Sequence, residues 1–286
     1  MKRLLLAATL AALMLVPAAS ASASLTGEYA RFNQCPLSNP AVEICVFSES
    51  SSGNFTLGKK NVPLVNPVIL KGGASGPAGV LGPLTFYAPT DGITLSKTPQ
   101  PVPGGLLGVV APSWWPQILK DLFNETINNG FTGVTATVEL AGSASSIKAN
   151  FLNALTQSGT VLGLPVKVKL SNSFLGSNCY IGSNSNPMQL NLTTGTTSPP
   201  PPNGPISGSA GELTEFEEKI LILKNNRLVD NSFSAPGANG CGGILFSWAV
   251  DPFVNSIVGV PSAAGTNTAI LQGSSYLAAA ENLRGM

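Results

Sequence analysis

The sequence predicts a mainly β fold, an antiparallel β-sandwich or barrel-like domain with one or two short packed helices. Segments in which apolar and polar residues alternate recur along the chain, and clusters of Gly, Pro, Asn and Ser separate them. In addition, charged residues make up only 10% of the 286 residues, against about 25% in an ordinary soluble domain. A neutral, polar surface of this kind is typical of secreted all-β proteins.

The N-terminal residues 1–23 have the pattern of a secretory signal peptide. Lys2 and Arg3 precede an apolar run over residues 4–16, and two overlapping A-x-A cleavage patterns follow it. We therefore expect residues 24–286 to form a single secreted β-rich domain, either extracellular or retained non-covalently in the cell envelope. No apolar run reaches the roughly 18 residues of a membrane-spanning helix, so no transmembrane segment is expected.

Six segments alternate at period 2, as half-buried strands do. The predicted strands are residues 62–70, 84–87, 134–140, 166–170, 188–193 and 220–223. Turn residues such as Lys71-Gly72-Gly73 separate them. Short strands bounded by turns favour an antiparallel sheet.

Two segments have helical periodicity instead. Residues 116–129 place Ile118, Leu119, Leu122 and Phe123 on one face, and Gly130 is placed to end the helix. Residues 145–157 are a second candidate, with apolar residues again at helical spacing. We expect these helices to cover one face or the ends of the sheet.

The four cysteines form an even set, for which pairing is the default in an oxidising compartment. Three connectivities are possible. We favour Cys35–Cys45, around a short loop, and Cys179–Cys241, across the proline-rich residues 195–211. That segment is then a stiff loop within the domain, whereas another connectivity would leave it free to be a linker.

The composition excludes several chemistries. The chain has no histidine, so it lacks Ser-His-Asp and Cys-His sites and histidine-bound zinc, and we expect no metal and no cofactor. Once Lys2 and Arg3 are removed, acids slightly outnumber bases, which argues against nucleic acid as a partner. Lys59-Lys60, the adjacent bases of the expected mature chain, are interpreted as a solvated turn.

No catalytic residue is predicted. Ser145 and Lys148 match S-x-x-K, but Lys-Thr-Gly is missing and a serine-rich chain gives such a match by chance. The acidic cluster over residues 212–218 is interpreted as solvated. Asp251 has apolar neighbours, which would raise its pKa if it were buried, and an N-cap role beside Pro252 fits it equally well.

Trp114 and Trp115 are the candidate ligand-binding residues, because an aromatic pair suits a carbohydrate or lipid surface. The alternative is that they pack into the core where the helix begins. Both stand between Pro112 and Pro116.

Four segments carry a resemblance to a known group: LGSNCYIG at 175–182, LNLTTGTTSPPPP at 190–202, LVDNSF at 228–233 and NGCGG at 239–243. They are similar to segments of uncharacterised secreted proteins of high-GC Gram-positive (actinobacterial) bacteria. The resemblance covers most of the mature chain, most tellingly residues 105–271. It implies an exported bacterial protein and supports Cys179–Cys241 as a pair, but it implies no activity.

The function expected from the sequence is that of an exported, non-enzymatic β-rich protein that binds or structures the cell envelope through a glycan or a lipid. The alternatives are a carboxylate-based hydrolase of wall polysaccharide and a carrier of an apolar ligand. The ligand, the strand order and the oligomeric state are not encoded in any pattern of the sequence.

Overall fold

A computed structural model describes residues 24–77, 79, 82–127 and 132–286 of the chain. The expected signal peptide, residues 1–23, and the expected helix end at Gly130 lie outside the described residues. The mainly β, antiparallel fold is confirmed. Its strands belong to one 14-stranded sheet, ordered β11-β12-β14-β1-β3-β4-β7-β8-β6-β5, with β2, β9, β10 and β13 paired beside this path.

All strand pairs in the sheet are antiparallel. The strands are β1 (Ile44–Leu57), β2 (Lys60–Pro63), β3 (Val68–Ser75), β4 (Pro83–Tyr87), β5 (Pro99–Pro101), β6 (Thr135–Leu140), β7 (Lys148–Asn150), β8 (Leu162–Ser171), β9 (Tyr180–Ile181), β10 (Met188–Leu192), β11 (Glu212–Phe216), β12 (Ile220–Asp230), β13 (Ala238–Asn239) and β14 (Thr268–Ala279).

The sheet curves back on itself. An isolated bridge joins Thr193, just after β10, to Val229 of β12. Apolar side chains of the β12-β14-β1-β3 half therefore pack against those of β6, β8 and β10 in one core. This packing of two sheet faces gives the fold its sandwich-like character.

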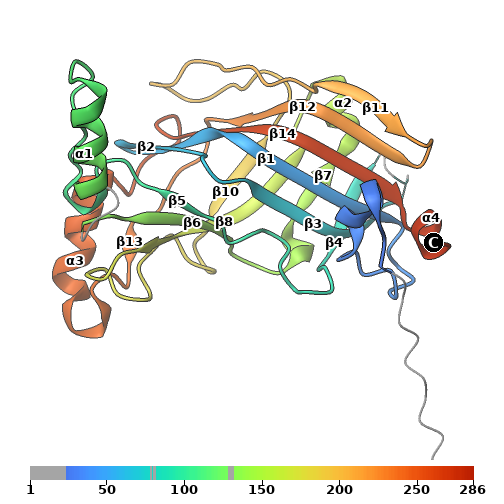
Figure 1. The fold of residues 1–286 in the computed structure, drawn as a ribbon, viewed down its shortest axis with the longest axis horizontal. Coiled ribbons are helices and arrows are strands. Elements are labelled where there is room, and N and C mark those ends of the chain that lie inside the picture. The colour runs from blue at the N-terminus through green and yellow to red at the C-terminus, as the bar shows by residue number, and fades with distance from the viewer. Residues whose placement is uncertain (1–23, 78, 80–81, 128–131) are drawn as a thin grey trace, which may run out of the picture.

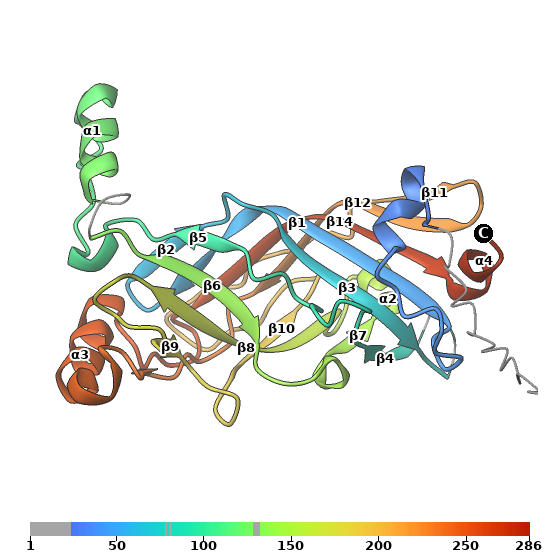
Figure 2. The same cartoon turned by 60° about the horizontal axis from the view of Figure 1, so that its bottom comes forward.

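The helices occupy the two ends of an elongated molecule (Figure 1). α1 (Gln117–Ile127) and α3 (Gly243–Val258) lie at one end, and α4 (Ala280–Arg284) lies with the C-terminus at the other. The turned view in Figure 2 shows the same division. The other helices of the described residues are α2 (Phe151–Thr156) and the 3₁₀ helices Gly27–Phe32, Gly105–Leu107 and Ala144–Ser146.

Two predicted segments are divided in the structure. Residues 62–70 form the end of β2 and the start of β3, because the chain turns between them and buried Gln100 accepts hydrogen bonds from the backbone N–H groups of Val65 and Asn66. Residues 145–157 form β7 and then the shorter α2, which begins where the Asn150 side chain accepts from the Asn153 N–H. The predicted turn at Lys71-Gly72-Gly73 is wrong, since these residues lie inside β3.

Both expected disulfides are present. Cys35–Cys45 belongs to a small second core at the α4 end, and Cys179–Cys241 belongs to the main core. At the α4 end the Arg284 guanidinium also donates to three backbone carbonyls, those of Leu37, Asn39 and Val42. The disulfide therefore ties the segment around Cys35 to β1, and the Arg284 guanidinium ties α4 to the loop that precedes β1.

The proline-rich residues 195–211 fold back as a loop. Thr196 and Ser207 form a bridge across it, and Ser209 pairs with Arg227 of β12. The Asn203 side chain donates to the carbonyl oxygens of Asn231 and Asn267. The loop therefore lies against the body of the molecule.

Candidate functional site

The end of the molecule that carries α1 and α3 is unusually apolar. Most exposed large apolar side chains of the described residues lie in 105–122 or 243–253: Leu107, Val109, Val110, Trp114, Ile118, Leu119, Leu122, Ile244, Leu245, Phe246, Trp248 and Phe253. We refer to residues 105–127 and 243–258 as the apolar end. Such a concentration of exposed apolar surface marks an interaction site or a surface prone to aggregation.

The candidate tryptophans lie at the start of α1. Trp114 is 79% exposed, whereas Trp115 is half-buried and its ring packs edge-on against Phe123, with 5.7 Å between ring centroids. Neither indole belongs to the core clusters of the described residues: Trp115 packs where the helix begins, and Trp114 is largely exposed. The third tryptophan, Trp248, is 78% exposed on α3, so all three tryptophans of the chain belong to the apolar end.

The predicted apolar face of α1 points outward. Ile118 is 77% exposed and Leu122 is 64% exposed. The other side of the helix is polar, and there Gln117 donates to the Asp121 carboxylate. α1 is thus an amphipathic helix that leaves Ile118 and Leu122 exposed, while Phe123 on the same face packs against Trp115.

α3 is the functional element that sequence reasoning missed. Its segment GILFSWAVDPFVNSIV contains one charged residue, Asp251, and an internal proline. Ile244 at its start is 99% exposed, and among the sixteen residues of the helix Val254 alone is buried. The mostly apolar, uncharged run before Asp251, interrupted only by Ser247, was the signal in the sequence, but it lacks the amphipathic periodicity that marks a surface helix.

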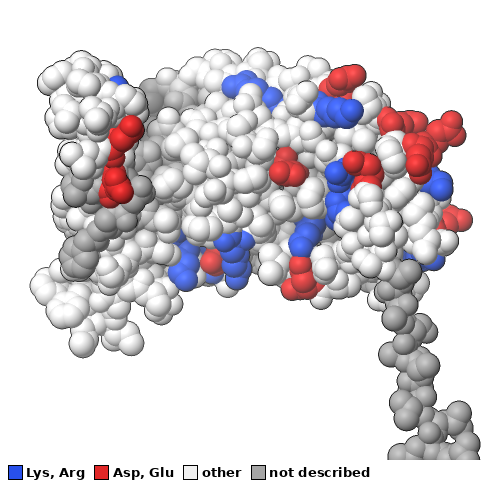
Figure 3. Space-filling view, in the orientation of Figure 1, with Lys and Arg blue, Asp and Glu red and all other residues white. Residues whose placement is uncertain are grey.

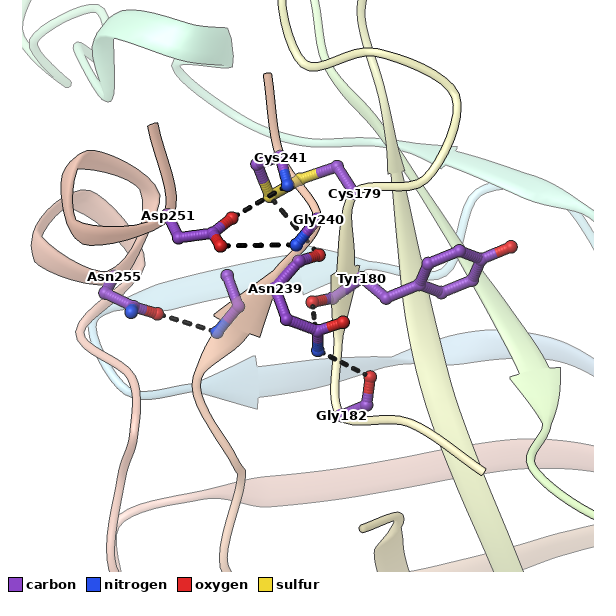
Figure 4. The surroundings of a disulfide bond; sticks show 9 residues. Cys179, Tyr180, Gly182, Asn239, Gly240, Cys241, Asp251 and Asn255 are labelled. Atoms are coloured by element: carbon purple, nitrogen blue, oxygen red, sulfur yellow. Dashed lines mark hydrogen bonds between the residues drawn. A yellow bond between two sulfur atoms is a disulfide. The ribbon is translucent and has the colours of Figure 1, made fainter. Parts of the chain in front are cut away.

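A small polar network fixes α3 to the sheet (Figure 4). The Asp251 carboxylate accepts hydrogen bonds from the backbone N–H groups of Cys241 (2.7 Å) and Gly240 (3.3 Å), next to the Cys179–Cys241 disulfide. The Asn255 side chain accepts from the Ala238 N–H at 2.7 Å. Asp251 is therefore not an N-cap, because it lies within the helix and binds the chain that precedes it.

Two long stretches of the sequence that reach into the apolar end are almost free of charge. Between Lys97 and Lys120 the sequence has no charged residue, and between Asp230 and Glu281 it has only Asp251. In Figure 3 the α3 region shows no charged side chains, whereas charged side chains lie on α1 at the same end, over the middle and at the opposite end of the face shown. The low charge at this end thus belongs to α3 and to the segment before α1, and not to α1 itself.

Two neighbouring apolar cavities lie inside this end. The larger, of about 60 Å³, is lined by strands of both sheet halves and by Val258 of α3. The smaller, of about 40 Å³, lies below Phe253, Val254 and Ile257 of α3. α3 therefore covers an incompletely filled part of the core.

Lys60 is the only charged residue that lines either cavity. A Cβ placed on Gly108 would lie 3.0 Å from Lys60 Nζ and 3.2 Å from Ile257 Cγ2, so the ammonium lies between the 105–108 loop and α3. Burial lowers the pKa of Lys60. Within the described ranges its side chain has no ion-pair partner. The interpretation of Lys59-Lys60 as a solvated turn holds for exposed Lys59 but is wrong for half-buried Lys60.

The other sequence candidates do not form a reactive site. Ser145 Oγ pairs with Ser143 Oγ at 2.8 Å, and Lys148 is exposed on β7. The four glutamates of residues 212–218 are exposed, and Glu217 accepts from the Tyr29 hydroxyl. Across the described residues, no group of three or more Cys, Asp or Glu side chains is placed to hold a metal ion.

Buried Asp230 has a structural environment. Its carboxylate accepts from the backbone N–H groups of Asn191 (2.7 Å) and Ser232 (2.8 Å). Burial raises the pKa of this carboxyl, and the two hydrogen bonds oppose that shift. The group therefore joins β10 to the end of β12.

Comparison of the chain with protein-family models, with curated proteins and with solved structures finds no match. Among the helices of the described residues, none combines the length and the apolar character needed to cross a membrane.

Proposed function

We propose that this protein is exported, is not an enzyme, and attaches to the lipid of the cell envelope through its apolar end. The observation that carries the proposal is the exposure of Ile244, Leu245, Phe246 and Trp248 on an almost uncharged helix, at the same end of the molecule as the exposed apolar residues of α1. The apolar run at residues 4–16 and the two disulfides support export.

The distribution of side chains around α3 favours lipid over a protein groove. Residues 244, 245, 246 and 248 point in directions about 100° apart per residue, so they cover more than half of the helix circumference. A protein groove accepts a single stripe at i, i+3, i+4 and i+7. A fluid hydrocarbon phase can contact all of these side chains at once.

The composition of the apolar end also fits a lipid surface. Trp114 and Trp248 are exposed in it, and tryptophan is enriched where hydrocarbon meets headgroups. Lys59 lies next to the last turn of α3 and donates to the Ser256 carbonyl oxygen. The amphipathic α1 has the character of a helix that lies in the interface plane.

Vesicle flotation tests the lipid proposal. The mature protein is mixed with vesicles of phosphatidylcholine and phosphatidylglycerol in equal amounts, and it is expected to float with them. Burial of one large apolar side chain contributes about 1.5–3 kcal/mol, and about 1.4 kcal/mol is a factor of ten in binding. Ile244→Asp is therefore expected to weaken binding at least about tenfold, without loss of fold because the side chain is fully exposed.

Leu213→Asp is the matched control, since Leu213 is an exposed apolar residue on β11, outside the apolar end. Lipids brominated on their acyl chains should quench the tryptophan emission, which comes only from the apolar end. Equal flotation of Ile244→Asp and wild type would contradict the proposal. A dimer that Ile244→Asp dissociates, without vesicle binding, would assign the surface to self-association instead.

Export is tested separately. The protein in the culture medium or envelope fraction is expected to begin near Ser24 by mass spectrometry. Recovery from the cytosol with Met1 retained would refute this half of the proposal.

A further inference from the structure

The cavities under α3 form a second feature, distinct from the outer surface of the helix. Their walls are apolar, from Val138 and Val168 on the sheet to Val258 on α3. Buried Gln100, the polar side chain deepest in this wall, is occupied with backbone partners at residues 65 and 66. The interior therefore offers apolar contact and one free charged group, Lys60.

We propose that these cavities and Lys60 bind a single-chain anionic amphiphile, with its acyl chain between the sheet halves and its headgroup at the Lys60 ammonium. A free cation at the edge of an apolar space is costly unless an anion or water satisfies it. The lining residues include no carboxylate that could do so. A carboxylate or phosphate that carries an apolar chain satisfies both the charge and the cavity.

Binding of such a ligand requires α3, which covers the cavities, to move. The cavities measure about 60 and 40 Å³, less together than the roughly 150 Å³ that admits benzene. α3 has only Val254 buried, and elements with few buried contacts open most readily. We infer that the acyl chain of the ligand enters beneath α3, while the Cys179–Cys241 bridge keeps the segment before the helix attached. This site lies beyond the surface attachment proposed above and does not depend on it.

The test uses fluorescent cis-parinaric acid and its uncharged methyl ester, titrated into the mature protein without vesicles. Wild type is expected to bind the acid more tightly than the ester. Lys60→Met should weaken binding of the acid about tenfold, the scale of a lost hydrogen bond to a charged group, and leave the ester unchanged. Lys59→Met is the matched control, because Lys59 is exposed and lines neither cavity.

A second variant tests the cavity itself. Ala136 is buried and lines the larger cavity, so Ala136→Phe should abolish binding of both probes while the protein still floats with vesicles. Competition by palmitate and by lysophosphatidylglycerol distinguishes a fatty acid from an anionic lipid as the source of the chain. Equal affinity for the acid and the ester, equal effects of the two lysine variants, or absence of binding by wild type would overturn the proposal. Because Ile244→Asp should retain probe binding, failure of the surface proposal is distinguishable from failure of this one.

Discussion

Removal of the Cys179–Cys241 bridge should destabilise the protein more than removal of Cys35–Cys45. In the chain-entropy model the contribution of a disulfide grows with the logarithm of the loop that it closes. The separation of 62 residues for Cys179–Cys241 corresponds to about 4 kcal/mol, and that of 10 residues for Cys35–Cys45 to about 3 kcal/mol. The bridge also anchors the segment to which α3 is bound, because the Cys241 backbone N–H, which alanine retains, donates to Asp251 of α3.

The comparison uses two alanine pairs, Cys179→Ala with Cys241→Ala and Cys35→Ala with Cys45→Ala. Guanidinium unfolding is followed by far-ultraviolet circular dichroism, which reports the sheet, and by tryptophan fluorescence, which reports the apolar end. We expect the first pair to cost about 2–5 kcal/mol and to shift the fluorescence transition to lower denaturant than the dichroism transition. Equal costs, or a larger cost for the Cys35–Cys45 pair, would refute this reasoning.

Three further perturbations follow from particular contacts. A Cβ on Gly273 would lie 1.8 Å from the Glu49 carbonyl oxygen across the β1–β14 pair. Gly273→Ala should therefore lower the free energy of unfolding by more than about 3 kcal/mol in urea unfolding. The control Gly204→Ala should leave urea unfolding unchanged, because there is open space around Gly204. Asp251→Asn leaves one backbone N–H without an acceptor and should speed hydrogen exchange over residues 240–258, with no change in the sheet. Burial raises the pKa of Asp230, so protonation of this carboxyl favours the folded state. As pH falls from neutral through that pKa, wild type should gain stability relative to Asp230→Asn in urea unfolding at each pH. A stability difference that does not change with pH would contradict the raised pKa.

The strands that sequence reasoning located are those in which one face is buried. β8 and β10 alternate between buried and less buried residues along their length, so their polar and apolar residues alternate as well. β1 was missed because its middle is rich in serine, and its neighbours on both sides provide the pairing that the pattern does not reveal. There Ser48 Oγ pairs with Ser275 Oγ of β14 at 2.9 Å, which satisfies both hydroxyls across the strands. Tertiary context thus overrides strand propensity.

Of the candidate site too, sequence reasoning found only the part that a local sequence pattern reveals. Trp114 and Trp115 were found because an aromatic pair is visible as a local pattern. Lys60 and α3 were not, because their importance comes from a juxtaposition of β2 with residues almost 200 positions later in the chain. Adjacent lysines have no pattern that separates an exposed side chain from one below a helix.

The two ends of the molecule differ in how firmly they are held, and this difference links the two proposals. At one end Cys35–Cys45 ties the preceding segment to β1, and Arg284 ties α4 to the loop before β1. At the other, α3 depends on Val254, on the polar contacts of Asp251 and Asn255, and on the neighbouring disulfide. A helix held in this way can change position in hydrocarbon while the sheet remains intact. Its outer side chains, such as Ile244, then determine attachment to lipid, whereas access to Lys60 depends on its inner side, so variants on the two sides should separate the two activities.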